Sequence, residues 1–224
     1  MKLIKNLNAG ANIFVVLGDV GSGKTSLALS HPGKRLVISF DSSYSSLEGH
    51  EDEVTVLEPE LSDYNTPDDF ITEIENKAKD YDLIVWDNLS AVETTLVEAL
   101  KEGKVGNNTD GRAAYGYLQT LVSKMSMSAL HNGKDNLFTF WTFATPEGKY
   151  EPSANAKAFN MVAGYAKLVS RTEVGFDGYT VVMNPDGRGV IKNRLADKIK
   201  KQSIKNEDYW KAVEFAKGTS HADA

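Results

Sequence analysis

The strongest chemical signal is an eight-residue run that reads Gly18-Asp19-Val20-Gly21-Ser22-Gly23-Lys24-Thr25 and matches G-x-x-x-x-G-K-[ST]. Glycines in such a phosphate-binding loop (P-loop) let successive backbone N–H groups converge on phosphate oxygens. Lys24 is expected to be a solvated charge that reaches the β- and γ-phosphates, and the Thr25 hydroxyl is expected to bind Mg²⁺. The run therefore predicts that residues 18–25 bind a nucleotide, which we expect to be ATP with Mg²⁺.

A second chemical group follows the apolar run Leu83-Ile84-Val85-Trp86, which has the composition of a buried strand and ends at Asp87. A carboxylate delivered by such a strand can hold Mg²⁺ through a water molecule, so Thr25 and Asp87 are the predicted metal site. The alternative is that Asp87 caps the next helix. Asn88 follows Asp87 where a glutamate could have served as a base, so the base must come from elsewhere.

Two acidic residues are candidates for this base. Asp41 ends the predicted second strand and is the first candidate, and Glu48 is the second. The alternative for Asp41 is a turn residue in front of Ser42. Thr139 and Thr142 lie on a later strand, where a hydroxyl could sense a γ-phosphate or be satisfied inside the sheet.

These residues need a scaffold, and the alternation of apolar strands with helical segments predicts an α/β fold with a mostly parallel sheet flanked by helices. A C-terminal antiparallel hairpin is predicted because a turn sequence at 184–187 joins two β-rich runs, 179–183 and 189–192. We expect one P-loop ATPase domain over 1–224, with a terminal helix and tail from 206. The predicted strands are 12–17, 36–40, 53–57, 83–86 and 137–143, and the predicted helices are 25–30, 67–79, 90–100, 113–130, 156–168 and 208–217.

Composition restricts the class of protein. The sequence has no cysteine, which excludes disulfides and cysteine-ligated zinc and fits a reducing cytoplasm. It has no apolar run long enough to cross a bilayer, so no membrane partner is expected. The formal net charge is −6, yet residues 41–100 hold 17 of the 31 acidic and only two of the 25 basic residues. Basic residues gather instead between Arg188 and Lys205, which indicates either a solvated face or a polyanion footprint.

Two long segments without helical or strand periodicity, 102–112 and 144–157, are the next signal, because long loops in compact domains are often functional. Both combine basic residues with aromatic neighbours, a composition that suits single-stranded nucleic acid. A lid without a ligand is the alternative. The predicted DNA contacts are Lys104, Arg112, Lys149, Tyr150 and Lys157.

A set of motifs spread over nearly the whole chain points to a known family. The motifs are residues 18–25, Phe40-Asp41, residues 83–87, residues 110–116 and Lys192-Asn193-Arg194. Through them the sequence resembles the RecA-type recombinase core, and within it the small phage-encoded RecA-core ATPases of DNA recombination and annealing. The sequence departs from the family at Ser43, where the family often has a glutamate.

The resemblance implies an ATPase in the cytoplasm of a bacterial host cell that binds single-stranded DNA through the two long loops. It also implies a second copy of the chain as a partner. The net charge of −6 argues against tight non-specific binding, so DNA affinity is expected to depend on ATP or on a single-strand-binding protein. In such a homo-oligomer, Lys192 and Arg194 would reach the γ-phosphate of the adjacent protomer. The departure at Ser43 leaves the identity of the base open and favours slow or DNA-stimulated hydrolysis.

Two other function classes stay open at this point. A small P-loop kinase is disfavoured because such kinases usually use an arginine-rich lid, and the five arginines of this chain are scattered. A non-hydrolysing, ATP-dependent interaction module is favoured by the missing glutamate. A GTPase is not expected, because the sequence contains no N-K-x-D run.

Overall fold

The computed structural model describes residues 12–105 and 110–218, and its strands form one ten-stranded sheet. The strands are β1 (Asn12–Gly18), β2 (Arg35–Ser39), β3 (Val54–Leu57), β4 (Leu83–Asp87), β5 (Asp135–Ala144), β6 (Tyr150–Pro152), β7 (Leu168–Gly175), β8 (Gly178–Val182), β9 (Lys192–Asn193) and β10 (Ser203–Lys205). Their order is β10-β8-β7-β1-β5-β4-β2-β3, with β6 paired to β5 and β9 to β7. The pairs from β7 through β1, β5, β4 and β2 to β3 are parallel, which confirms the predicted α/β class.

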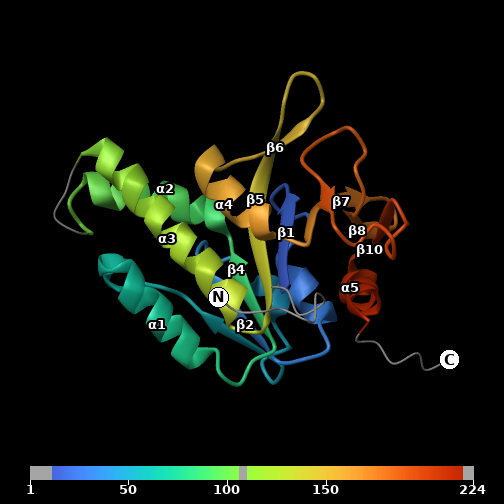
Figure 1. The fold of residues 1–224 in the computed structure, drawn as a ribbon, viewed down its shortest axis with the longest axis horizontal. Coiled ribbons are helices and arrows are strands. Elements are labelled where there is room, and N and C mark those ends of the chain that lie inside the picture. Colours follow the sequence, from blue (N-terminus) through green and yellow to red (C-terminus); the bar gives the residue numbers. More distant parts are fainter. Residues whose placement is uncertain (1–11, 106–109, 219–224) are drawn as a thin grey trace, which may run out of the picture.

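Helices cover both faces of this sheet. They are α1 (Pro67–Lys77), α2 (Leu89–Lys101), α3 (Gly111–His131), α4 (Ala156–Tyr165) and α5 (Tyr209–Lys217), with 3₁₀ turns η2 (Thr25–Ser30), η3 (Ser45–Leu47), η4 (Leu61–Asn65) and η5 (Asn206–Asp208). Alternate side chains of β1 enter different cores, as the period of a strand requires. Val15 packs in the core under α1 to α4, and Phe14 packs in the core under η2 and α5. Figure 1 shows α1 to α3 together on one side and α5 beside the β7–β8–β10 end.

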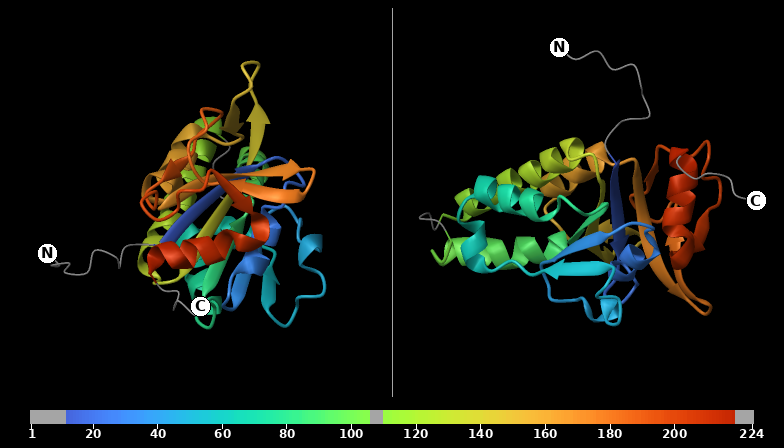
Figure 2. Two further views of the ribbon diagram at one scale, coloured as in Figure 1. Left: turned by 90° about the vertical axis from the view of Figure 1, so that its right-hand side faces the viewer. Right: turned by 90° about the horizontal axis from the view of Figure 1, so that it is seen from below.

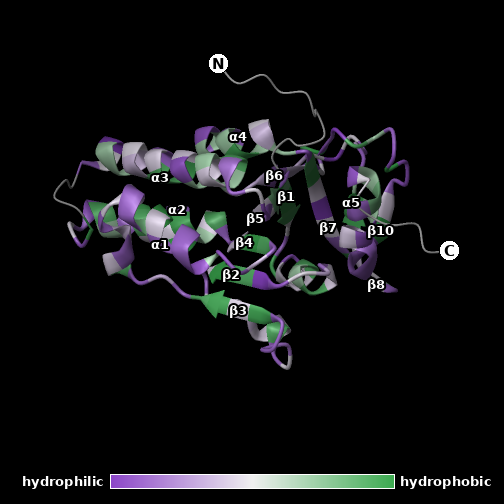
Figure 3. Ribbon diagram, turned by 60° about the horizontal axis from the view of Figure 1, so that its bottom comes forward, coloured by the Kyte–Doolittle hydropathy of each residue, from purple (hydrophilic) through white to green (hydrophobic). Residues whose placement is uncertain are grey.

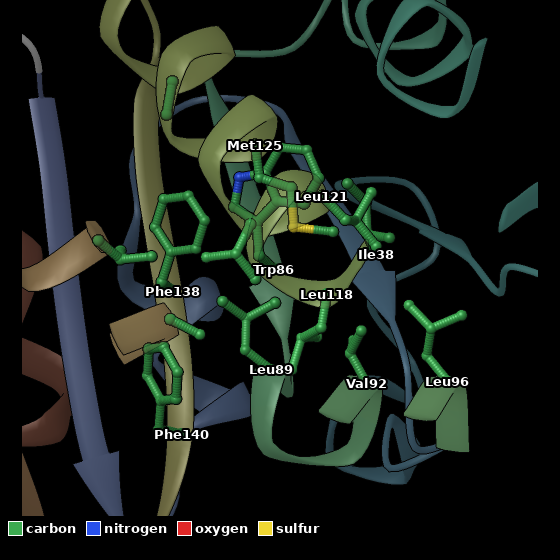
Figure 4. Close-up of a cluster of buried hydrophobic side chains, with 14 of the residues drawn as sticks. Ile38, Trp86, Leu89, Val92, Leu96, Leu118, Leu121, Met125, Phe138 and Phe140 are labelled. Carbon is green, nitrogen blue, oxygen red and sulfur yellow. The ribbon is translucent and has the colours of Figure 1, made fainter. Parts of the chain in front are cut away.

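The larger core fixes the carboxyl ends of β4 and β5. Trp86 on β4 and Phe138 on β5 are paired in register, and their rings stack at 5.6 Å with an interplanar angle of 7°. Leu118, Leu121 and Met125 of α3 close over them (Figure 4). Figure 3 shows hydrophobic residues concentrated along β2, β3 and β4. Because the two rings are fully buried, the next residues of both strands are held at defined positions.

The C-terminal hairpin differs from the prediction. β8 pairs antiparallel with β7 and with β10, and not with residues 189–192. The prediction was wrong because the tight turn of the hairpin lies at Phe176 and Asp177, between two glycines, of which Gly178 has φ 102°. The segment 184–191 is an irregular connection that leads to β9.

Smaller differences concern the helix boundaries. Residues 25–30, predicted as a helix, form a 3₁₀ turn that ends before Pro32, and α4 ends at Tyr165 rather than at residue 168. α1 begins as predicted, with Pro67 at its first position and Thr66 accepting a hydrogen bond from the backbone N of Asp69. Part of the predicted loop 102–112, residues 106–109, lies outside the described residues, as does the tail from 219. None of the helices in the described ranges has the length and apolarity that a membrane span requires.

Candidate functional site

A cleft of about 440 Å³ lies over the P-loop at the carboxyl ends of the parallel strands. Residues 20–26 form one wall, residues 41–46 after β2 form the other, and the end of β4 lies at the base. Trp141 and Tyr179 complete the lining. Strand ends of an open α/β sheet are the usual place for a ligand, so the topology and the motif indicate the same site.

Two P-loop glycines adopt backbone conformations that other residues resist. Gly21 has φ 74° and Gly23 has φ 84°. At Gly23 space is also limiting, because a Cβ atom there would lie 2.9 Å from Cγ of Tyr179. The glycine pattern of the motif is therefore required by the fold at these positions.

Lys24 is buried, and the expectation that it is a solvated charge was wrong. Its side chain is only 6% exposed, and Nζ donates hydrogen bonds to the carbonyl oxygens of Gly18 at 3.0 Å and Asp19 at 2.7 Å. Burial lowers the pKa of Lys24, while the carboxylates of Asp87, Asp41 and Asp19 act in the opposite direction. The P-loop thus holds a desolvated cation at the edge of the cleft, where a phosphate group would be a strong partner.

Asp87 joins the P-loop to the central strands. Its Oδ2 accepts a hydrogen bond from Oγ1 of Thr25 at 2.5 Å, and its Oδ1 accepts one from the hydroxyl of Thr139. Burial raises the pKa of Asp87, and the two hydroxyl donors counteract that rise. Thr139 is fully buried, so its hydroxyl is satisfied inside the sheet, the alternative weighed from the sequence. Asn88, and not Asp87, caps α2 by accepting from the backbone N of Ser90.

The oxygen atoms of Thr25 and Asp87 fit the predicted Mg²⁺ site in kind and in position. Mg²⁺ prefers oxygen ligands and commonly keeps waters and substrate phosphates in its shell, so it needs few protein groups. The described ranges contain no cluster of three or more histidine, aspartate or glutamate residues that could hold a metal ion. These two residues would hold the ion, which would neutralise phosphate charge.

The two candidate bases are placed differently. Asp41 lines the cleft, and its Oδ1 accepts a hydrogen bond from the backbone N of Ser43 at 3.0 Å. It therefore also has the turn role considered from the sequence. Glu48 is exposed and does not line the cleft. Among the residues that line the cleft, Asp41 is the carboxylate not already bound to Thr25.

Hydrogen bonds from β5 and β7 hold the P-loop in place. Thr142 donates to Oδ1 of Asp19 at 2.6 Å, and the hydroxyls of Ser22 and Thr172 lie 2.7 Å apart. The sequence drew attention to Thr142 as a polar residue at a strand end. It gave no signal for Thr172, which is far along the chain from the motif.

The four basic residues among the predicted DNA contacts lie in four places. Lys149 is exposed on the β5–β6 hairpin, which projects from the body of the molecule in Figures 1 and 2. Lys157 and Arg112 are exposed in the first turns of α4 and α3. Lys104 forms an ion pair with Glu102 at 2.7 Å. The four basic residues lie on different elements, and no contact joins one of them to another among the described residues.

Tyr150 has neighbours that the sequence did not indicate. Its ring packs against the guanidinium groups of Arg171 at 4.6 Å and Arg188 at 6.0 Å. Arg171 is buried and also pairs with Asp186 at 2.5 Å. The ring is thus half-buried in a structural cluster that ties β6 to β7.

A groove of about 670 Å³ lies between α2, the start of α3 and the β5–β6 hairpin. Tyr115 and Phe143 line it and are both well exposed, and Lys101 lies 5.7 Å from the ring centre of Tyr115. Glu93 and Glu98 line it too. The sequence did not single out Tyr115, although it falls within the motif 110–116.

Lys192 and Arg194, predicted at a subunit contact, bind the end of α4 in their own chain. Lys192 donates to the carbonyl oxygens of Ala163 and Gly164 at 2.7 and 2.9 Å, and Arg194 donates to Gly164 at 3.0 Å. Neither lines the cleft of its own chain. Cations are favourable at the carboxyl end of a helix, so both have a local role.

Comparisons with known proteins give a family for most of the chain. A family model described as an AAA domain matches residues 11–195, which include the P-loop, Asp41 and Asp87. No curated protein matches the sequence. A KaiC-like protein of the archaeon Pyrococcus horikoshii OT3 is similar with a TM-score of 0.49 and 12% identity, over 78% of this chain and 79% of that chain. The flagellar accessory protein FlaH of Methanocaldococcus jannaschii is similar with a TM-score of 0.47 and 12% identity, over 87% and 84%.

Proposed function

The chain belongs to the AAA domain family, and we propose that it is a RecA-type ATPase whose slow hydrolysis of ATP is coupled to single-stranded DNA. The observation that carries the ATPase part is the contact between Thr25 and Asp87 at 2.5 Å, beside the buried ammonium group of Lys24. A hydroxyl, a carboxylate and a cation meet at the point where a P-loop presents a terminal phosphate.

Hydrolysis needs a group that accepts a proton from the attacking water. Asp41 lines the same cleft and is the candidate base of the proposal. Its charge acts on both Lys24 and Asp87, so it lies within electrostatic reach of the phosphate site. Position 43, where the resemblance leads one to expect a glutamate, is a serine, which favours slow basal turnover.

Support for single-stranded DNA comes from the groove beside the β5–β6 hairpin. Tyr115 and Phe143 offer exposed ring faces on which bases can stack, and base–aromatic stacking tolerates any sequence. Glu93 and Glu98 disfavour phosphates inside the groove, so we assign phosphate contacts to Lys149, Lys157 and Arg112 outside it. We do not assign base stacking to Tyr150, because the guanidinium groups of Arg171 and Arg188 already pack against its ring.

The deciding experiment measures ATP turnover in the presence and absence of single-stranded oligonucleotides. The variant Lys24→Ala, which lacks the cation of the P-loop, is the control. We expect measurable turnover that rises with DNA and disappears in the variant. Turnover that persists in Lys24→Ala would indicate a contaminant. Turnover that ignores DNA, together with no DNA binding by fluorescence anisotropy, would leave an ATPase with another partner.

A non-hydrolysing ATP-dependent module is the second candidate, and the position of Glu48 favours it. Because Glu48 is exposed and outside the cleft, hydrolysis in this proposal depends on Asp41 alone. Tight binding of ATP without turnover, in the presence and absence of DNA, would support this candidate over the first.

A further inference from the structure

A second groove, of about 450 Å³, adjoins the phosphate cleft. One wall is η2 and the other is made by the turn of the β7–β8 hairpin and by residues 205–207. Ser26 and Tyr179 line both hollows, so the cleft and this side groove meet at these two residues. We propose that the side groove holds the nucleoside part of the nucleotide, with Tyr179 as the side chain that packs against the base.

The direction of the bound nucleotide follows from the proposed phosphate site, on which this inference rests. Lys24, Thr25 and Asp87 mark the end of the cleft that receives the β- and γ-phosphates. Asp41 lies at the same end. The nucleoside must therefore leave the cleft elsewhere, and the side groove opens at Ser26, the residue directly after the motif.

Tyr179 is suited to this position. Its ring packs against the backbone of Gly23, where an added Cβ would lie 2.9 Å from Cγ and 3.1 Å from Cδ1. The residue is nevertheless 45% exposed, so one side of the ring supports the P-loop and the rest faces the two hollows. An aromatic face held rigidly beside a phosphate site offers stacking to a base at little cost in conformational entropy.

The wall to which Tyr179 belongs is also tied to the P-loop by Asn206. Its Nδ2 donates to the carbonyl oxygen of Gly23 at 3.0 Å and to Oγ of Ser26 at 3.1 Å. Its Oδ1 is buried and has no hydrogen-bond partner within the described residues, so an acceptor is left over beside the groove. Asp177 and Glu207 add carboxylates, which are suitable acceptors for sugar hydroxyls.

Calorimetry with ATP and with inorganic tripolyphosphate separates the nucleoside contact from the phosphate contact. We expect Tyr179→Ala to weaken ATP binding roughly ten-fold and to leave tripolyphosphate binding unchanged. Tyr179→Phe keeps the ring and should bind ATP within about two-fold of the parent. Phe176→Ala is the matched control, because Phe176 is fully exposed on the same hairpin and lines neither hollow.

Unchanged ATP affinity in Tyr179→Ala would overturn the proposal. An equal loss for ATP and tripolyphosphate would also overturn it, because the ring would then act only as a support for the P-loop. Unchanged ATP affinity in Lys24→Ala would be a different result, because it would contradict the phosphate site of the proposed function and not the nucleoside contact alone.

Photolabelling with 8-azido-ATP gives an independent readout that needs no variant. Trypsin releases Tyr179 and Asp177 in the peptide 172–188 and Asn206 in the peptide 206–211, because no lysine or arginine interrupts either. We expect the label on one of these two peptides, protected by excess ATP. Label confined to peptides other than these two and 25–34, which carries the facing wall η2, would place the base elsewhere and overturn the assignment.

Discussion

Thr139 on β5 donates a hydrogen bond to Asp87 on β4, across two strands whose preceding residues, Phe138 and Trp86, are paired in register. The hydroxyl of Thr139 is a buried donor that stabilises the charged form of the Asp87 carboxyl group at the base of the cleft. Without such donors, burial would drive that carboxyl group towards its neutral form.

Thr139→Val should therefore shift Mg²⁺-dependent ATP binding to higher pH. Burial already raises the pKa of Asp87, and the loss of a hydrogen-bond donor to its charged form raises that pKa further. A higher pH is therefore needed before the carboxylate forms. The measurement is ATP affinity against pH with Mg²⁺ present. Thr142→Val, on the same strand but bonded to Asp19, is the control and should leave the pH midpoint in place.

Lys24→Ala should weaken ATP binding by roughly 100-fold, because a charge-assisted contact to phosphate is lost. The fold should persist, since burial makes the charged ammonium group unfavourable where it lies and lowers its pKa. Calorimetry measures the first effect and thermal unfolding the second. A large drop in melting temperature would show that Lys24 is needed for folding and would leave its binding role undecided by this variant.

Asp41→Asn should reduce turnover by about 100-fold or more while ATP still binds, because only the proton acceptor is lost. Glu48→Gln is the matched control and should keep parental turnover, since Glu48 lies outside the cleft. If the two variants behave in the opposite way, the base is Glu48, and residues 41–48 must rearrange when ATP binds.

Lys149 and Lys157 should contribute to the dependence of DNA affinity on salt concentration, because each is proposed to contact a phosphate. Each phosphate contact to a single strand contributes about 0.7 to the slope of log affinity against log salt, so Lys149→Ala with Lys157→Ala should lower that slope by about 1.4. Anisotropy with a labelled oligonucleotide at several salt concentrations measures it. Lys77→Ala, in the acidic part of the chain and paired with Glu73, should leave the slope unchanged.

A buried charge network under α5 should make the fold sensitive to acid. Asp135 accepts hydrogen bonds from His31 at 3.2 Å and from Lys217 at 2.8 Å. Burial by itself would raise the pKa of Asp135, but these two partners outweigh it and hold the pKa below its usual value. Because the folded-state pKa is depressed, the stabilisation is complete above the unfolded value of about 4 and is lost as the pH falls further.

Asp135→Asn should accordingly lower the free energy of unfolding at neutral pH by about 1–3 kcal/mol, because Lys217 loses its buried partner and keeps only Glu214. Urea unfolding at pH 7 and pH 4 measures this, and the difference between parent and variant should shrink as the pH falls below about 4. Glu73→Gln removes an exposed pair and should change stability by less than about 0.5 kcal/mol. Equal stability of parent and Asp135→Asn at pH 7 would contradict the network.

The sequence predicted the parallel strands and the P-loop because both depend on local patterns. Apolar runs such as 12–17 and 83–86 are short enough to read as buried strands, and the motif 18–25 specifies its own backbone. The β7–β8 hairpin was not predicted because the turn sequence at 184–187 is the stronger local signal. The weaker pair of glycines around Phe176 and Asp177 forms the actual turn.

The rest of the candidate site could not be read from local patterns. Tyr179, Thr172 and Asn206 contact the P-loop from more than 140 positions away in the chain. Periodicity and turn rules carry no information on such pairs. The burial of Lys24 is a similar case, because it depends on two carbonyl groups whose direction is set by the folded loop.

The family likeness ends at residue 195, yet the segment that follows is attached to the nucleotide loop. Nε1 of Trp210 donates to the carbonyl oxygen of Leu27 at 3.0 Å, and Asn206 holds Gly23. The family match therefore ends before the residues that brace the nucleotide loop. A fragment cut at the family boundary would keep the whole motif but lose the clamp that immobilises it, and loss of ATP binding by such a fragment would be a folding defect.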